Sequence, residues 1–232
     1  MPISEAFQRW WPLPDSLDLV RAPIKVAASA VLTEVTRFVE GGQLSSTWVP
    51  FASVDQVFGS VAIFTNVPTV FFVLPTHSDW TVLWNNSFLC DGYDSLCWCL
   101  TTNHAMTTMH WRSSDEDAVF QAGSSFTFRS HAESRLNERS VYCCKNDKRW
   151  EFDAVGGPLP EEDLPAYLAR RKRDRLNEQG MLNFLRKLGA RPWEDDFYQA
   201  GEAFRIERIA YPGTISQKRF PAFACKRVRF SG

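Results

Sequence analysis

Short apolar runs separated by polar turns fill residues 70–111, and this pattern constrains the fold more than any other part of the 232-residue chain. Tryptophans occur inside the runs: they are Trp80, Trp84, Trp98 and Trp111. Runs of this length with turn residues between them predict the strands of an antiparallel sheet. Residues 95–101 are largely apolar on both alternating faces, so we predict that they form a central strand covered on both sides.

Helical periodicity flanks this region on both sides. Apolar residues recur at helical spacing over residues 23–40, and a capping box over residues 53–56 predicts a short second helix. After a Gly- and Pro-rich break at 156–160, acidic residues in a first turn and an apolar stripe over 181–188 predict further helices. The predicted fold is α+β: a twisted antiparallel β-sheet core of about seven to nine strands, with an N-terminal helix and C-terminal helices packed on it.

The composition, with 44% hydrophobic and 23% charged residues, suits a globular chain, and we predict a single domain over residues 1–232. Its predicted parts are an N-terminal arm (1–22), a helical region (23–60), an antiparallel β-meander (61–155), a helical segment (156–192) and C-terminal strands (193–232). The arm is predicted because Pro12 and Pro14 exclude a continuous helix. The predicted strands are 61–65, 69–74, 81–85, 95–101, 107–112, 124–129, 140–145, 149–153, 204–209, 214–216 and 223–230.

Charge and hydropathy bear on location and partners. The net charge of −1 creates no overall field that would attract nucleic acid or an anionic membrane. The N-terminus has no basic segment followed by an apolar one, and the longest apolar runs are too short to span a bilayer. We therefore expect a cytoplasmic protein with no membrane partner, in which the cysteines are free buried thiols.

The cysteines and histidines allow two kinds of chemical site, a zinc site and an enzyme active site. Cys97, Cys99, His104 and His110 follow the pattern C-x-C-x4-H-x5-H, which is not a usual zinc-finger spacing. An enzyme would instead use Cys90 with His104 or His110, oriented by Asp91 or Asp94, in a pocket of the sheet. It would be a small cytosolic, hydrolase-like enzyme, and its thiol, imidazole and carboxylate would meet in an open cleft.

Recognised catalytic and phosphate-binding motifs are absent from the sequence. No G-x-S-x-G elbow, H-E-x-x-H motif, Walker loop or G-x-G-x-x-G loop occurs. We therefore favour a non-catalytic protein and expect no catalytic residue, no metal and no cofactor.

A run of basic residues over 170–175 allows a nucleic-acid-binding alternative. Five of its six residues are cationic. A second basic set, which could converge with it, consists of Lys218, Arg219, Lys226, Arg227 and Arg229. Acidic residues bracket the run, so a helix with internal salt bridges is the favoured interpretation and nucleic acid is an unlikely partner.

Taken together, an α+β chain rich in tryptophan, free of catalytic motifs and with acidic clusters in its loops resembles the immunity proteins that bacteria encode beside toxins of contact-dependent or type VI secretion systems. The resemblance lies in overall character, and no residue is carried over from a member of that class. It implies a tight one-to-one complex with a cognate toxin domain. Inhibition would follow from covering the toxin's active site or blocking a necessary movement.

The residues predicted to bind such a partner lie in polar loops. The first group lies in the loop before the predicted central strand, and the second is an acidic cluster: they are Asp91, Tyr93, Asp94, Asp115, Glu116 and Asp117. Aromatic and charged side chains are the residue types that supply most of the affinity in protein interfaces. We therefore predict that these residues anchor the complex.

Overall fold

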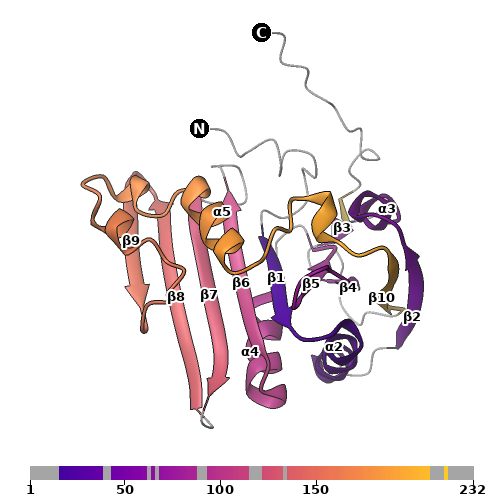
Figure 1. Cartoon of the computed structure of the whole chain (residues 1–232). Helices are drawn as coiled ribbons and strands as arrows, with labels where there is room; N and C mark the ends of the chain where they lie inside the picture. The colour runs from indigo at the N-terminus through magenta and orange to yellow at the C-terminus, as the bar shows by residue number, and fades with distance from the viewer. Residues whose placement is uncertain are drawn as a thin grey trace.

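A nine-stranded antiparallel sheet organises the computed structural model of the protein (Figure 1). The structure describes residues 16–38, 43–61, 64–65, 68–87, 93–114, 122–132, 135–209 and 217–218. The strand order is β2-β10-β4-β5-β1-β6-β7-β8-β9. The bounds are β1 Ser16–Arg21, β2 Leu44–Phe51, β4 Val70–Leu74, β5 Trp80–Asn85, β6 Thr107–Ser114, β7 Gly123–Ala132, β8 Arg135–Asn146, β9 Arg149–Val155 and β10 Gly201–Arg208. A separate short pair joins β3 (Phe64–Thr65) to β11 (Gln217–Lys218).

Four α-helices accompany the sheet in the described part of the chain, and the predicted α+β class with an antiparallel sheet is confirmed. The helices are α2 Ile24–Phe38, α3 Val54–Gly59, α4 Tyr93–His104 and α5 Glu178–Lys187, and the 3-10 turns are η1 Leu164–Leu168, η2 Lys172–Asp174 and η3 Asp195–Phe197. None of the described helices combines the length and apolar character that crossing a bilayer would require.

One surface of the sheet, here called the α5 face, carries the larger apolar cluster, including Trp84 and Trp111. Phe126 of β7 stacks on Phe184 of α5 with 4.4 Å between ring centroids. The indole nitrogen of Trp80 donates a 2.8 Å hydrogen bond to the carbonyl of Leu188, where α5 ends. Most of the tryptophans predicted to lie in strands therefore fill the core.

The opposite surface, the α4 face, is covered only in part by the helices that the structure describes. A second apolar cluster joins α2 and α4 to Val20, Val73 and Leu83 of the sheet. Helix α4 contacts β1, β6 and β7. Beyond α4, the side chains that β8 and β9 turn to this face include Glu138, exposed Tyr142 and a run of charged residues. This part of the sheet therefore presents exposed polar groups.

The predicted central strand over residues 95–101 is wrong, because these residues lie inside helix α4. The buried side chains recur at helical spacing: they are Leu96, Cys97, Leu100 and Thr101. A strand covered on both faces and a buried helix share an all-round apolar pattern, so periodicity alone does not separate them. Packing against β6 and α2 favours the helix. The helix ends before Ala105, whose φ is 54°.

The predicted N-terminal part also differs from the structure. Residues 16–21, assigned to an arm ending at residue 22, form β1 between β5 and β6. The predicted helical region 23–60 contains α2 and α3 but also strand β2. The predicted capping box is confirmed in part: Ser53 Oγ accepts from the N–H of Gln56, whereas Gln56 Oε1 accepts from the N–H of Ala52 and not from that of Ser53.

Within the predicted meander over 61–155, β4 pairs with β5 and β6 to β9 are consecutive neighbours, but β1 lies between β5 and β6 and the segment between these two strands contains α4. In the predicted helical segment 156–192, only Glu178–Lys187 is α-helical, and the remainder contains the 3-10 helices η1 and η2, turns and irregular chain. Strand β10 confirms the predicted strand at 204–209. The predicted strands at 214–216 and 223–230 lie outside the described residues.

Candidate functional site

Strand register on the α4 face brings polar residues from distant parts of the sequence together. Asp18 of β1 pairs with His110 of β6, His110 with Thr127 of β7, and Thr127 with Ser140 of β8. Because directly opposed residues on adjacent strands project to the same side, the four form one row on the α4 face. The Oγ atoms of Thr127 and Ser140 lie 3.3 Å apart.

Asp18 and His110 form a buried carboxylate–imidazole pair. Asp18 is fully buried, and its Oδ1 lies 2.8 Å from His110 Nδ1. Burial raises the pKa of Asp18 and outweighs the opposing effect of His110. Burial alone would lower the pKa of His110, but the hydrogen bond and the charge of Asp18 raise it. The carboxylate thus orients the imidazole and favours its protonated form.

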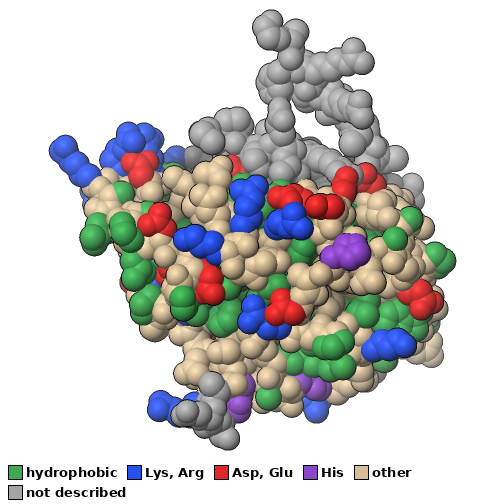
Figure 2. All heavy atoms as spheres, in the orientation of Figure 1, with side chains coloured by type: hydrophobic (Ala, Val, Ile, Leu, Met, Phe, Trp, Pro, Cys, Tyr) green, Lys and Arg blue, Asp and Glu red, His purple; other side chains and the backbone are tan. Residues whose placement is uncertain are grey.

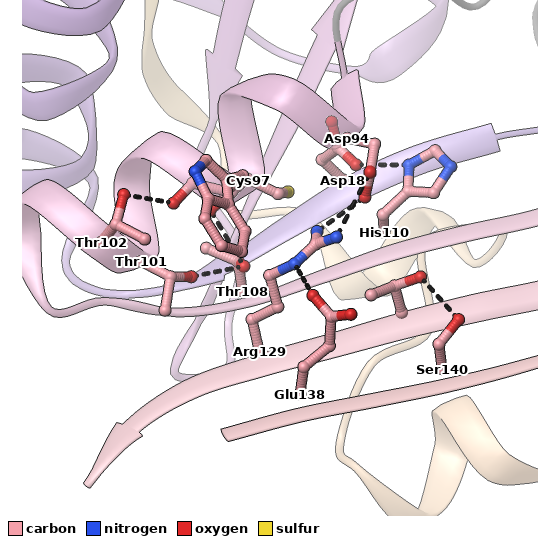
Figure 3. A network of polar contacts seen from close by, with 12 residues as sticks. Asp18, Asp94, Cys97, Thr101, Thr102, Thr108, His110, Arg129, Glu138 and Ser140 are labelled. Carbon is pink, nitrogen blue, oxygen red and sulfur yellow. Dashed lines mark hydrogen bonds and ion pairs between the residues drawn. The ribbon is translucent and has the colours of Figure 1, made fainter. Parts of the chain in front are cut away.

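A thiol adjoins this pair, as Figure 3 shows. Cys97 is buried in α4 and interacts with the carboxylate of Asp18. Burial, together with the negative charge of Asp18, raises the pKa of Cys97 well above its ordinary value. The thiolate that a cysteine nucleophile needs is therefore disfavoured. Thiol, carboxylate and imidazole do meet, but the thiol faces the carboxylate and stays protonated.

Next to this row, a buried arginine holds two exposed carboxylates (Figure 3). Arg129 Nη1 and Nη2 donate to the two oxygens of Asp94 at 2.6 and 3.2 Å, and Nε donates to Glu138 at 2.6 Å. The Arg129 side chain is only 6% exposed, whereas those of Asp94 and Glu138 are 56% and 41% exposed. Bidentate pairing with a buried fork restricts the rotamers of both carboxylates.

An exposed tryptophan completes this arrangement. Trp98 is 46% exposed, and the guanidinium carbon of Arg129 lies 5.8 Å from its ring centroid. We refer to Asp94, Trp98 and Glu138, with Arg129 beneath them, as the acidic–aromatic patch. It combines fixed negative charge with a large aromatic surface, and both are open to solvent.

Of the residues predicted to bind a partner, Asp94 belongs to this patch. Tyr93 begins α4, but its side chain lies outside the described residues, as do Asp91, Asp115, Glu116 and Asp117. Sequence reasoning missed the other patch members. A signal was present for one contact, because a hairpin between the predicted strands at 124–129 and 140–145 can place Arg129 opposite Glu138.

The histidines of the predicted enzyme do not converge. His104 Nε2 lies 2.7 Å from Oε1 of Glu34, a buried residue of α2, while His110 pairs with Asp18. Burial would raise the pKa of Glu34, but hydrogen bonds from His104, Asn103 and Arg37 lower it. The third member, Cys90, lies outside the described residues.

The four predicted zinc ligands do not form a metal cluster either. Within the described residues, no group of three or more Cys, His, Asp or Glu side chains is arranged to hold a metal ion. Cys97 faces Asp18, whereas burial and the charge of Glu34 raise the pKa of Cys99. Helix α4 turns the two thiols to different sides, which a strand would not have done.

The basic run at 170–175 is largely engaged within the chain. Arg171 Nε pairs with Asp174 at 2.6 Å, and the guanidinium of Arg175 lies 5.3 Å from the ring centroid of Phe152. Of the second basic set, only the backbone of Lys218 is described, and Arg219, Lys226, Arg227 and Arg229 lie outside the described residues. Figure 2 shows cationic and anionic side chains interspersed on the side that carries α5.

Comparison with protein-family models, with curated proteins and with solved structures finds no match. Function must therefore be argued from the site itself.

Proposed function

We propose that the protein is a protein-binding inhibitor of the immunity type, which neutralises a cognate bacterial toxin in the cytoplasm by forming a tight complex through the acidic–aromatic patch. The observation that supports this proposal is that buried Arg129 fixes Asp94 and Glu138 beside exposed Trp98. Tryptophan and charged residues in such settings are typical anchors of protein interfaces.

Preorganisation is the physical reason that this patch suits tight binding. An exposed carboxylate normally loses side-chain freedom when a partner orders it, and this loss opposes association. Here Arg129 already orders Asp94 and Glu138 in the free protein. A partner that binds them pays less of this entropic cost.

The charge of the patch indicates the chemistry of the partner. Two carboxylates share one guanidinium, so the patch is negative, and the indole of Trp98 can accept a further cation on its face. A toxin surface that presents Lys or Arg would match it. Because the charges are exposed, the association rate is expected to fall as salt increases.

The experiment pairs this chain with the product of the neighbouring gene. That product is expressed with and without the chain in a sensitive host, and growth and complex affinity are measured. We expect the chain to restore growth, and the double variant Asp94→Asn/Trp98→Ala to weaken binding by about 30-fold or more, since the loss of even one interface anchor costs about 2 kcal/mol.

A matched control changes the same residue classes elsewhere on the surface. Asp79→Asn/Phe38→Ala alters an exposed carboxylate and an exposed aromatic outside the patch. It should bind and protect like the wild type. Unchanged affinity of the patch variant in a complex that forms would exclude this surface, and failure of every neighbouring product to bind would overturn the proposed function.

A second candidate rests on the Asp18–His110 pair. An imidazole oriented by a buried carboxylate is the arrangement of a general base. Such an enzyme would lose turnover in the His110→Gln variant while toxin binding through the patch persisted. Cys97 would not be its nucleophile, because its pKa is raised.

A further inference from the structure

The two outer strands of the sheet differ in how their free edges are treated. β2 and β9 are the terminal strands, and they lie at opposite ends of the sheet in Figure 1. An outer strand turns every second backbone N–H and carbonyl toward solvent, where another strand can pair with them. The register of each strand reveals which groups these are.

The β9 edge is protected. Asn146 and Arg149 flank a two-residue turn and form a hydrogen-bonded pair, so Trp150, Phe152 and Ala154 direct their backbone groups outward. The outward N–H of Ala154 is already bonded to the carboxylate of Asp153 at 2.8 Å. Three charged side chains in β9 further disfavour pairing: they are Arg149, Glu151 and Asp153.

The β2 edge has neither protection. The N–H of Ile209 donates to the carbonyl of Gln43, which continues the β10–β2 ladder. This bond shows which alternate residues of β2 form hydrogen-bonded pairs with β10. Ser45 and Thr47 therefore bond to β10, while the backbone of Ser46 and Trp48 faces outward. The N–H groups of Ser46 and Trp48 have no hydrogen-bond partner among the described residues.

The position of a proline independently supports this assignment of outward-facing residues in β2. Pro50, which has no N–H, falls at an outward position, where strands tolerate proline. Among the described residues, the outward groups of β2 have one local contact, a long 3.3 Å hydrogen bond from the Thr47 hydroxyl to the Trp48 carbonyl. The central part of the edge is thus free to pair.

We propose that two copies of this chain associate through their β2 strands, antiparallel about a two-fold axis at Thr47, to form one continuous sheet. In this register Ser46 of each copy exchanges both backbone hydrogen bonds with the second copy's Trp48. Leu44 donates to the second copy's Pro50 carbonyl, so the missing N–H falls at the end of the ladder.

The chemistry of β2 favours a second copy over a charged peptide as the occupant. The strand reads LSSTWVPF and contains no charged residue, so self-pairing places no like charges opposite each other. The axis sets Thr47 against Thr47, a favourable cross-strand pair. The shared surface is small, so we expect a dissociation constant on the order of micromolar.

Sedimentation analysis of the full chain over a range of concentrations tests the proposal. The mass of the wild type should rise from one copy toward two, and the amides of Ser46 and Trp48 should exchange more slowly as the concentration increases. A wild type that stays monomeric throughout the range would overturn the proposal.

Variants locate the contact. Ser46→Pro removes an outward N–H without touching the β10 ladder and should raise the dissociation constant about tenfold or more, whereas Ser46→Ala should not. Thr47→Lys faces two cations across the axis and gives a second test if Ser46→Pro does not fold. Thr47→Val and, on the opposite edge, Ala154→Pro are controls that should dimerise. A dimer that survives both Ser46→Pro and Thr47→Lys would place the interface elsewhere.

Discussion

Two buried arginines on neighbouring strands both pair with carboxylates, but the carboxylates are buried in one case and exposed in the other. Arg129 of β7 and Arg139 of β8 lie one register step apart and point to opposite faces of the sheet. Arg139 forms a bidentate pair with Glu162 at 2.9 and 2.6 Å, and both side chains are buried. Arg129 instead holds carboxylates that face solvent.

The difference lies in what the paired carboxylate does next. Glu162 also accepts the N–H of Leu159, and Arg139 donates to the carbonyl of Gly156, so this pair ties the segment after β9 to the sheet. Among the described residues, the Asp94 and Glu138 side chains make no such contact with the backbone, and much of their surface is exposed. We call Arg139–Glu162 the closed pair, because both of its side chains are buried, and Arg129 with Asp94 and Glu138 the open pair, because its carboxylates are exposed. The closed pair contributes to folding, and the open pair is suited to recognition.

Breaking the closed pair should have the largest effect. Arg139→Met leaves the Glu162 carboxylate buried without its guanidinium, which costs about 3–5 kcal/mol of unfolding free energy. Urea denaturation measures the loss. The double variant Arg139→Met/Glu162→Gln should recover part of it, and a single variant as stable as the wild type would contradict the structural role of the pair.

Breaking the open pair should cost less. In Arg129→Met, Asp94 and Glu138 can be hydrated, so we expect a loss of about 1–2 kcal/mol. The same denaturation experiment compares the two arginines directly. If Arg129→Met were as destabilising as Arg139→Met, the distinction between an open and a closed pair would fail.

The Asp18–His110 pair, which adjoins the open pair, should make stability depend on pH. The folded pKa of His110 is raised above 6.5, so its contribution is complete below that pH and is lost as the pH rises through the folded pKa. The folded pKa of Asp18 is raised above 3.8, so its contribution to stability is likewise lost as the pH rises from 3.8 through the folded pKa.

The unfolding free energy of the wild type should therefore decrease as the pH rises above 6.5. An NMR titration of the imidazole should give a pKa above 6.5 in the wild type. In Asp18→Asn it should fall, since burial then acts without the carboxylate. An unchanged pKa in Asp18→Asn would show that Asp18 does not control His110.

The smallest effect on stability is expected for Trp98→Ala. The side chain is exposed, so its removal should change the unfolding free energy by no more than about 0.5 kcal/mol. The thermal midpoint measures this, with Phe126→Ala, which empties a buried stacked site, as a destabilised reference. A large loss for Trp98→Ala would assign the indole to the core and weaken its role in the patch.

Much of the sheet is predictable because its turns carry strong local signals. The pairing of β8 with β9 follows from Asn146-Asp147-Lys148, where Asp147 adopts a φ of 51° that the turn requires. Strand β1 was not predictable, because a charged residue interrupts a six-residue strand, and the side chains that accompany Asp18 in the core, His110 and Cys97, lie far along the chain.

The candidate site depended on the same long-range information. Asp94 could be singled out by residue type, but its neighbours follow from α4 being a helix and from the registry of β7 with β8. Local periodicity did not distinguish a helix from a strand at α4. The length of the loop between β7 and β8 did not determine the register of these two strands. The patch therefore becomes visible only once the tertiary structure is known.

The position of β1 has a consequence for how the chain assembles during synthesis. Leu19 pairs with Val82 on one side and with Met109 on the other, so this early strand must wait for both partners to leave the ribosome. Strand β10 arrives later still and inserts between β2 and β4. Such distant pairings make loop closure costly, so we expect slow folding in which the two halves of the sheet are joined late.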